Sequence, residues 1–257
     1  MASGWNWIRA GMGRAGVVAC LVALNWAVAC HAQALTVPFT ETFATGDANW
    51  KIGATVGEVP TWQSSGGPAN SAYISRQFTV PTTGSGFSGP LLFRGQDSFD
   101  SSNDRFVGDW ITGGVGQFSV NLRHNAAAAV LFEVRLANAA NSPGASTVST
   151  SVPANTWTTL TVPIVDSAAV FQTYGQLGNP PNASAFAAIF SSIGNIQIGL
   201  APVGIQDASV RGGTWTFDVA APSIAAVPEP GTWASLAAAA AGIAAIRWHR
   251  LRGRRAA

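Results

Sequence analysis

Hydrophobic and polar residues alternate in short stretches through the middle of the chain, between residues 36 and 219. Residues 117–122 read Gln-Phe-Ser-Val-Asn-Leu and residues 214–219 read Thr-Trp-Thr-Phe-Asp-Val. In an extended strand this pattern puts apolar side chains on one face and polar side chains on the other. Stretches of this kind that are rich in β-branched and aromatic residues predict strands at 36–43, 72–80, 116–123, 130–137, 156–164, 195–200 and 214–219.

One segment, 183–193, has the spacing of a helix instead. Its apolar residues recur three or four positions apart, at Phe186, Ile189, Phe190 and Ile193, and an Asn-Pro-Pro breaker precedes it. Clusters of Gly, Pro, Asn and Ser separate the other segments. Many short strands and one short helix predict an all-β fold, an antiparallel β-sandwich over residues 35–225.

The first 34 residues predict a secretory signal peptide. Arg9 and Arg14 form a basic start, residues 15–29 are largely apolar, and an Ala-Gln-Ala triplet ends at Ala34. We expect signal peptidase and the secretion machinery to act on this segment, with cleavage after Ala34. An alternative is lipoprotein processing, because the Ala-Val-Ala-Cys sequence ending at Cys30 would leave a lipidated cysteine at the new terminus.

Residues 226–257 form a tail with three parts. The motif at 227–231 comprises Val227, Pro228, Glu229, Pro230 and Gly231. An uncharged segment, 232–246, follows, and it would be roughly 22 Å long as a helix, against about 30 Å for the hydrocarbon core of a bilayer. A basic end, 247–257, carries five arginines that would hold the C-terminus in the cytoplasm. The tail therefore predicts a single membrane-spanning helix with the folded domain outside.

This combination resembles the PEP-CTERM sorting signal of Gram-negative bacteria that produce exopolysaccharide. The resemblance implies that an exosortase, a membrane enzyme similar to transpeptidases, recognises the Pro-Glu-Pro motif. It also implies an inner-membrane-anchored precursor whose processed form reaches the cell surface or the extracellular matrix. The alternative is a plain tail anchor in which the triplet is chance linker composition.

The order of features across residues 36–220 resembles the jelly-roll domains of the galactose-binding-like group, which includes laminin IV-type and carbohydrate-binding modules. The resemblance rests on Phe43 with Trp50, the segments 106–110 and 157–164, the helical Phe186–Phe190 segment and the closing segment 215–219. It is a likeness of strand order and aromatic placement, and a fold of this kind does not fix a function.

Charge and cysteine content change once both targeting ends are removed. Residues 35–225 carry seven basic and eleven acidic side chains, a formal charge of −4. This balance argues against a nucleic-acid partner, which would need a clustered basic face. Both cysteines, Cys20 and Cys30, precede Ala34, so the mature domain is expected to lack disulfides and thiol chemistry.

Structural calcium is the one cofactor that the resemblance implies. Domains of this group often hold calcium between acidic residues of the first and last strands, and the matching positions here are Glu41 and Asp218. The acidic loop 97–104, continuing to Asp109, is a second candidate. The alternative for both is that these side chains are solvated or bond to turns.

Aromatic side chains in or near loops are candidates for stacking on sugar rings. They are Trp50, Trp62, Tyr73, Trp110 and Tyr174. We predict Trp62 and Trp110 as ligand-binding residues, Trp62 first because Gln-Ser-Ser-Gly-Gly follows it. The alternative is that each belongs to the core. Trp157 and Trp215 lie inside alternating strands and are predicted to be core residues.

Catalytic patterns are missing from the sequence. His124 is the only histidine between residues 35 and 225 and follows a predicted strand, which favours an exposed or turn-bonding imidazole. No nucleophile elbow, zinc-protease motif or phosphate-binding loop occurs. The three glutamates of the domain form no paired motif for glycoside hydrolysis. A pair of Asp residues within 97–109 is the remaining candidate for the two catalytic carboxylates of a hydrolase.

The sequence thus predicts an exported, non-enzymatic protein of the cell surface or of an exopolysaccharide biofilm matrix. A carbohydrate-binding module used for glycan attachment is the alternative, and a secreted glycan hydrolase is a third. The expected partners are an exosortase-type enzyme and an extracellular polysaccharide.

Overall fold

The structure is a computed structural model that describes residues 35–53, 58–82, 90–173, 179–205 and 207–226. Several predicted features lie outside the described residues: the signal peptide with Ala34 and Cys30, the motif at 227–231, the span at 232–246, and Tyr174. Among the described residues, no helix has the length and apolarity needed to cross a membrane.

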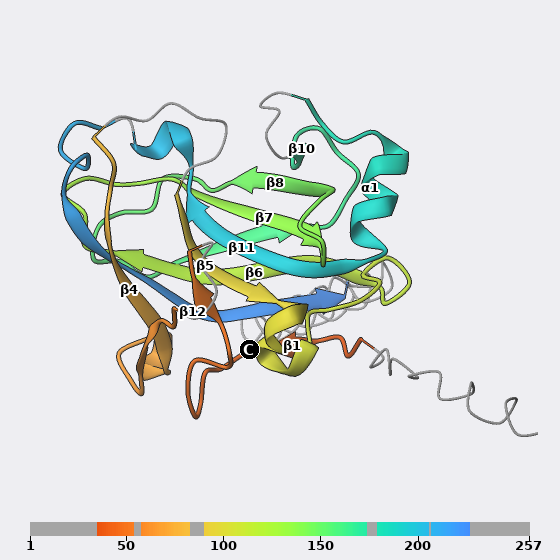
Figure 1. Ribbon diagram of the computed structural model, residues 1–257, viewed down its shortest axis with the longest axis horizontal. Coiled ribbons are helices and arrows are strands. Elements are labelled where there is room, and N and C mark those ends of the chain that lie inside the picture. Colours follow the sequence, from red (N-terminus) through yellow and green to blue (C-terminus); the bar gives the residue numbers. More distant parts are fainter. Residues whose placement is uncertain (1–34, 54–57, 83–89, 174–178, 206, 227–257) are drawn as a thin grey trace, which may run out of the picture. The chain divides into compact units, whose positions relative to one another are not determined.

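The strands form two antiparallel sheets, which we call sheet A and sheet B (Figure 1). Sheet A has the order β3 (Thr61–Gln63), β4 (Tyr73–Thr79), β12 (Thr214–Ala226), β6 (Val115–His124) and β9 (Thr158–Pro163), and β1 (Phe39–Thr40) also pairs with β12. Sheet B has the order β10 (Gln172–Thr173), β8 (Gly144–Val148), β7 (Phe132–Asn138), β11 (Ile193–Leu200), β5 (Leu91–Gln96) and β2 (Lys51–Ile52).

One α-helix and four short 3₁₀ helices complete the described part of the chain. The α-helix, α1 (Ala183–Phe190), begins after Asn182, whose side chain accepts a hydrogen bond from the amide of Ala185, and it contacts β7 and β8 (Figure 1). The 3₁₀ helices are η1 (Pro68–Asn70), η2 (Asp97–Phe99), η3 (Ser101–Asp104) and η4 (Pro202–Ile205).

The longer strands follow a jelly-roll path. β4, β12, β6 and β9 are neighbours in sheet A, and β5, β11, β7 and β8 are neighbours in sheet B. The chain passes from one sheet to the other between most of these strands, and the apolar residues of both sheets belong to one hydrophobic cluster. The predicted antiparallel sandwich with one short helix is therefore confirmed.

The core is built from the inward faces of both sheets. On β6, Phe118, Val120 and Leu122 are fully buried and alternate with more exposed residues, as the sequence pattern predicts. Trp50 and Trp110 are also fully buried, and their indole N–H groups donate to Ser102 Oγ and to the carbonyl of Phe106. Large buried aromatic residues with satisfied polar atoms give a domain without disulfides its stability.

Five strands lack a matching sequence prediction: β2, β3, β5, β8 and β10. β5 reads Leu-Leu-Phe-Arg-Gly-Gln and is mostly buried on both faces, so it shows no alternation. β8 consists of small residues, and the other three strands have two or three residues each. The helix ends at Phe190 rather than 193, because Ile193 begins β11.

Candidate functional site

The outer face of sheet A carries uncharged polar side chains around one ion pair. Residues 74, 122 and 219 point into the core, so their neighbours point outward. The outward residues include several exposed hydroxyls and amides, namely Gln77, Thr79, Gln117, Thr159, Thr161 and Thr214. Some of them bond across strands, as Thr79 Oγ1 does with Thr214 Oγ1 at 2.7 Å and Thr159 Oγ1 with Asn121 Oδ1 at 2.7 Å.

The ion pair joins β6 and β12. Asp218 lies directly opposite Arg123, and Arg123 Nε donates to Asp218 Oδ2 at 2.8 Å. Asp218 is only 4% exposed, and its second oxygen, Oδ1, has no hydrogen-bond partner among the described residues. A buried carboxylate oxygen without a donor is unfavourable, and a bound water molecule would stabilise this atom.

Two aromatic rings hold the Arg123 guanidinium in place. Its Cζ lies 4.5 Å from the ring centroid of Trp157 and 5.0 Å from that of Tyr73. The two rings meet edge to face with centroids 5.4 Å apart. Cation–π contacts of this kind fix the guanidinium above the sheet and leave both rings partly exposed.

The loop between β3 and β4 reaches over the same face. The carbonyl of Gly66 accepts hydrogen bonds from Trp157 Nε1 at 3.1 Å and from Arg123 Nη1 at 3.3 Å. Two hydrogen bonds close this loop, from the Gly67 amide to the Ser71 carbonyl and from the Gly66 amide to Asn70 Oδ1. The Gln-Ser-Ser-Gly-Gly sequence therefore contributes to this site, through Gly66, whereas Trp62 before it does not.

Beside the ion pair lies a cavity of about 240 Å³, which we call the Asp218 pocket. It is lined by Arg123, His124, Asn125, Asn155, Thr216 and Asp218. Asn125 Oδ1 accepts from the amide of Thr216 at 2.7 Å, and this bond fixes the end of β6 against β12. Drug-sized sites usually measure about 300–1,000 Å³, so this pocket is smaller than a drug-sized site.

His124 lines the pocket but belongs to the core, since it is only 1% exposed. Nδ1 accepts from the amide of Ala126, so Nε2 carries the proton and donates to the carbonyl of Val152 at 2.9 Å. Burial lowers the pKa of His124, although the Val152 carbonyl and Asp218 act in the opposite direction. The predicted turn-bonding imidazole is confirmed and the exposed one is wrong. Both ring nitrogens are occupied, which makes His124 unsuited to general-base catalysis.

Trp62 and Trp110, the predicted ligand-binding residues, lie in different environments. Trp110 is fully buried against Phe118 and Phe190, so its ring has no surface for stacking on a sugar. Trp62 is 38% exposed, and its Nε1 donates to the carbonyl of Phe43 at 2.7 Å. Trp62 pairs with the core residue Ile74, which places it on the opposite face of the sheet from Tyr73.

Trp157 was predicted to be a core residue, and this prediction is wrong. Trp157 is a partly exposed residue of the outer face of sheet A. Thr158 pairs with Leu122, so residue 157 stands beside Arg123 on the outward row. The sequence contains the necessary signal, because Trp157 is out of phase with Leu160 and Val162. Trp215 is half-buried, packs against the core and donates from Nε1 to the carbonyl of Val210.

Glu41 and Asp218, the predicted calcium ligands, have different hydrogen-bond partners. Glu41 Oε1 accepts from the amide of Phe43 at 2.7 Å, and the Glu41 amide donates to the carbonyl of Pro222. Pro222 lies four residues beyond Asp218 on β12, and a register shift between Ala220 and Ser223 lies between them. Calcium binding stays a prediction, to be tested by comparing the melting temperature in calcium with that in chelator.

The acidic loop contains η2 and η3. Burial raises the pKa of Asp104, and the nearby charges of Asp97 and Asp100 raise it further. Asp109 Oδ1 accepts from the amides of Ile111 and Thr112, which is the turn-bonding role considered for this loop. No group of three or more His, Cys, Asp or Glu side chains suited to a metal occurs among the described residues.

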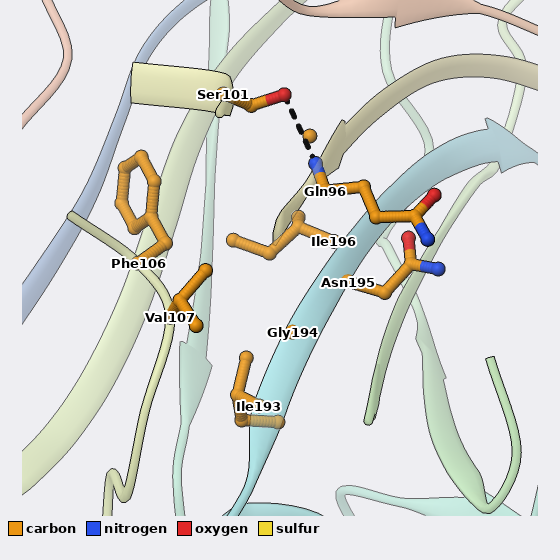
Figure 2. A pocket seen from close by; sticks show the side chains of 9 residues that line it. Gln96, Ser101, Phe106, Val107, Ile193, Gly194, Asn195 and Ile196 are labelled. Carbon is orange, nitrogen blue, oxygen red and sulfur yellow. Dashed lines mark hydrogen bonds between the residues drawn. The ribbon is translucent and has the colours of Figure 1, made fainter. Parts of the chain in front are cut away.

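A second cavity lies where this loop meets β5 and β11 (Figure 2). Phe106, Val107 and Ile193 line one side, and the side chains of Gln96 and Asn195 lie next to each other on the other (Figure 2). The amide of Gln96 donates to Ser101 Oγ at 3.0 Å. The volume of this second cavity, about 10 Å³, is at the lower limit for one water molecule, so the cavity is not a ligand site.

Comparison with known families identifies the tail. Residues 226–251 match the PEP-CTERM protein-sorting motif. The chain therefore carries this sorting motif, as its sequence pattern predicts. The motif implies exosortase processing and indicates an exported protein that is membrane-anchored before processing.

Several solved structures are similar to this chain at low identity. The L4b domain of human laminin alpha-2 has 8% identity and a TM-score of 0.46, over 74% of this chain and 99% of that chain. A family 11 carbohydrate-binding module from Clostridium thermocellum, in complex with a β-1,3-1,4-mixed-linked tetrasaccharide, has 14% identity and a TM-score of 0.45, over 76% of this chain and 99% of that chain. No curated protein sequence matches this chain. The sandwich assignment rests on the strand pairing described above.

Proposed function

We propose that this protein is an exported, non-enzymatic component of the cell surface or of an exopolysaccharide matrix. The observation that carries the proposal is the PEP-CTERM motif at residues 226–251. The uncharged polar surface of sheet A supports it, because such a surface is compatible with a hydrated polysaccharide. The protein would be cut near Ala34 and near the Pro228–Pro230 motif.

The test is the mass and location of the protein in its own cells, with and without alanines at residues 228–230. We expect the wild-type protein outside the cell, shortened at both ends, and the variant in the inner membrane with its tail intact. If both forms keep the tail in the inner membrane, the tail is a plain anchor and the matrix proposal is wrong. A cysteine-terminated, lipidated form beginning at Cys30 would instead support the lipoprotein alternative.

A second proposed function, carbohydrate binding, is favoured by the Asp218 pocket. Asp218, two asparagines and a threonine line it, together with Arg123 and His124. Trp157 and Tyr73 stand next to Arg123 and offer partly exposed rings. Sugar hydroxyls would bond to the carboxylate and amides, while an apolar sugar face would lie against an aromatic ring. We propose that this outer face binds a neutral glycan.

Binding is measured by retention of the exported protein in gels that contain matrix polysaccharide and by quenching of tryptophan fluorescence. Trp157→Ala should weaken binding about tenfold, equivalent to about 1.4 kcal/mol. Trp157→Phe keeps an aromatic ring and should retain most of the affinity. Trp62→Ala is the matched control, because it removes an exposed indole from the other face.

Loss of binding in Trp62→Ala but not in Trp157→Ala would place the glycan at Trp62 instead. Absence of binding across a broad panel of neutral glycans would disprove the second function. It would leave the first proposal untouched, because sorting is measured without any ligand.

A further inference from the structure

Sheet B carries a continuous row of polar side chains across its outer face. Cross-strand pairing places one polar residue of each strand opposite the next, in the order Lys51, Arg94, Gln197, Arg135, Ser146 and Gln172. Their neighbours Phe93, Ile196, Ile198, Val134 and Leu136 are buried in the core, so this row points away from it. Three of its six residues are cationic.

The middle of the row is occupied by the chain itself. Asn141, in the hairpin between β7 and β8, turns back over the sheet. Its Oδ1 accepts from Gln197 Nε2 at 2.7 Å, Asn195 Nδ2 at 3.0 Å and Arg135 Nη1 at 3.1 Å. Its carbonyl accepts from Arg135 Nη2. Arg135 and Gln197 are accordingly buried, and their role is to hold the hairpin.

The β2–β5 end of the row differs, because its two cations have no acidic partner. Lys51 and Arg94 lie directly opposite each other on neighbouring strands and are only half-buried. Neither forms an ion pair with any described residue. The contacts of the Arg94 guanidinium are a 3.4 Å hydrogen bond from Nε to Asn195 Oδ1 and the Phe99 ring 5.6 Å away.

This arrangement is unfavourable for the protein alone. Like charges directly opposite on adjacent strands destabilise a sheet, and burial lowers the pKa of Arg94 with no carboxylate to oppose the change. The acidic residue of this face, Glu133, pairs with Gly199 and Val148, two strands away from Arg94. The domain has a formal charge of −4, so acidic side chains outnumber basic ones, yet none of the described ones forms an ion pair with these two adjacent cations.

We propose that Lys51 and Arg94 bind carboxylate groups of an acidic, uronate-type polysaccharide along the β2–β5 edge of sheet B. The planar Arg94 guanidinium can bond a carboxylate through two parallel N–H groups, and the Lys51 ammonium adds a second charge. Asn195 and Gln197 on the adjoining strand are buried and bonded to Asn141, so Lys51 and Arg94 would carry the contact with the polysaccharide. This site is separate from the Asp218 pocket and does not depend on it.

The test uses the protein as cells export it, in gels that contain polygalacturonate, dextran sulfate or uncharged dextran, and in solution with duplex DNA. We expect retention by polygalacturonate that weakens as salt rises, and no retention by uncharged dextran. Arg94→Gln should bind polygalacturonate at least about tenfold more weakly, and Lys51→Gln/Arg94→Gln more weakly still. Arg105→Gln, which removes the same charge from a position outside the row, should bind as the wild type does.

Lys51→Glu reverses a half-exposed charge without touching the core, and it repeats the test if Arg94→Gln lowers the melting temperature. Unchanged binding in both variants would overturn the proposal. Equal or tighter binding of dextran sulfate or DNA by the wild-type protein would also overturn the proposal. The site would then recognise negative charge in general and would not select carboxylate groups.

Discussion

The outer faces of the two sheets differ in how their charges are neutralised. On sheet A, Arg123 and Asp218 neutralise each other at 2.8 Å, and uncharged aromatic, hydroxyl and amide side chains surround them. On sheet B, Lys51 and Arg94 lie opposite each other without an acidic partner, while Asn141 covers the centre of the row. The first face is therefore suited to uncharged hydroxyl groups and the second to anions.

The largest expected difference between the faces is in stability. Arg123→Ala leaves Asp218 buried without its counter-charge, which should cost about 2–4 kcal/mol of the free energy of unfolding. Arg94→Ala removes a cation without an acidic partner and should cost less than about 1 kcal/mol. Urea unfolding of both variants measures the contrast. Equal losses would mean that Arg94 has a structural partner comparable to Asp218.

The Asn141 network should contribute the next largest effect. Asn141→Gly removes the acceptor of three hydrogen bonds and should cost about 1–3 kcal/mol, because Arg135 and Gln197 stay buried with fewer partners. Asn155→Gly is the matched control, since both asparagines have positive φ, 67° and 57°, and glycine tolerates this conformation. Thermal unfolding should show little change for the control. A similar loss in both variants would indicate that the network is not the cause.

The smallest effect expected is a pH dependence from His124, beneath sheet A. Its folded-state pKa lies below the usual value of about 6.5, so the unfolded state binds the proton more readily. Stability should therefore be full above about pH 6.5 and decline as the pH falls from there toward the folded pKa. Denaturant unfolding between pH 7.5 and 5 measures this decline. His124→Gln should abolish this component, and an unchanged decline in the variant would assign it to other groups.

The two faces also differ in how far the sequence predicts them. Sheet A has one solvent-facing side, so residues 117–122 and 214–219 alternate and their strands are predicted. β5 and β11 of sheet B are buried on both sides, and β5 shows no alternation to read. The alternating strands were therefore predicted and β5 was missed for lack of alternation, whereas β11, although buried throughout, was predicted at 195–200.

The candidate sites depend on strand pairing, which a single sequence does not contain. Arg123 and Asp218 are 95 residues apart and meet because β6 pairs with β12 in one register. Lys51 and Arg94 meet because the two residues of β2 pair with β5. The sequence shows that Trp157 is out of phase with Leu160 and Val162, whereas its position beside Arg123 required the pairing of β6 with β9. The sorting tail needed no tertiary contacts, and its sequence pattern alone identified it.

Hydrogen exchange of the exported protein, alone and with each class of glycan, tests the central claim most directly. A neutral matrix glycan should slow exchange in the Gly66 loop, at 155–158 and at 214–218, and polygalacturonate should slow it at 50–53 and 91–96. Protection of the same segments by both glycans, or of neither region by any glycan, would contradict the assignment of two faces with different ligands.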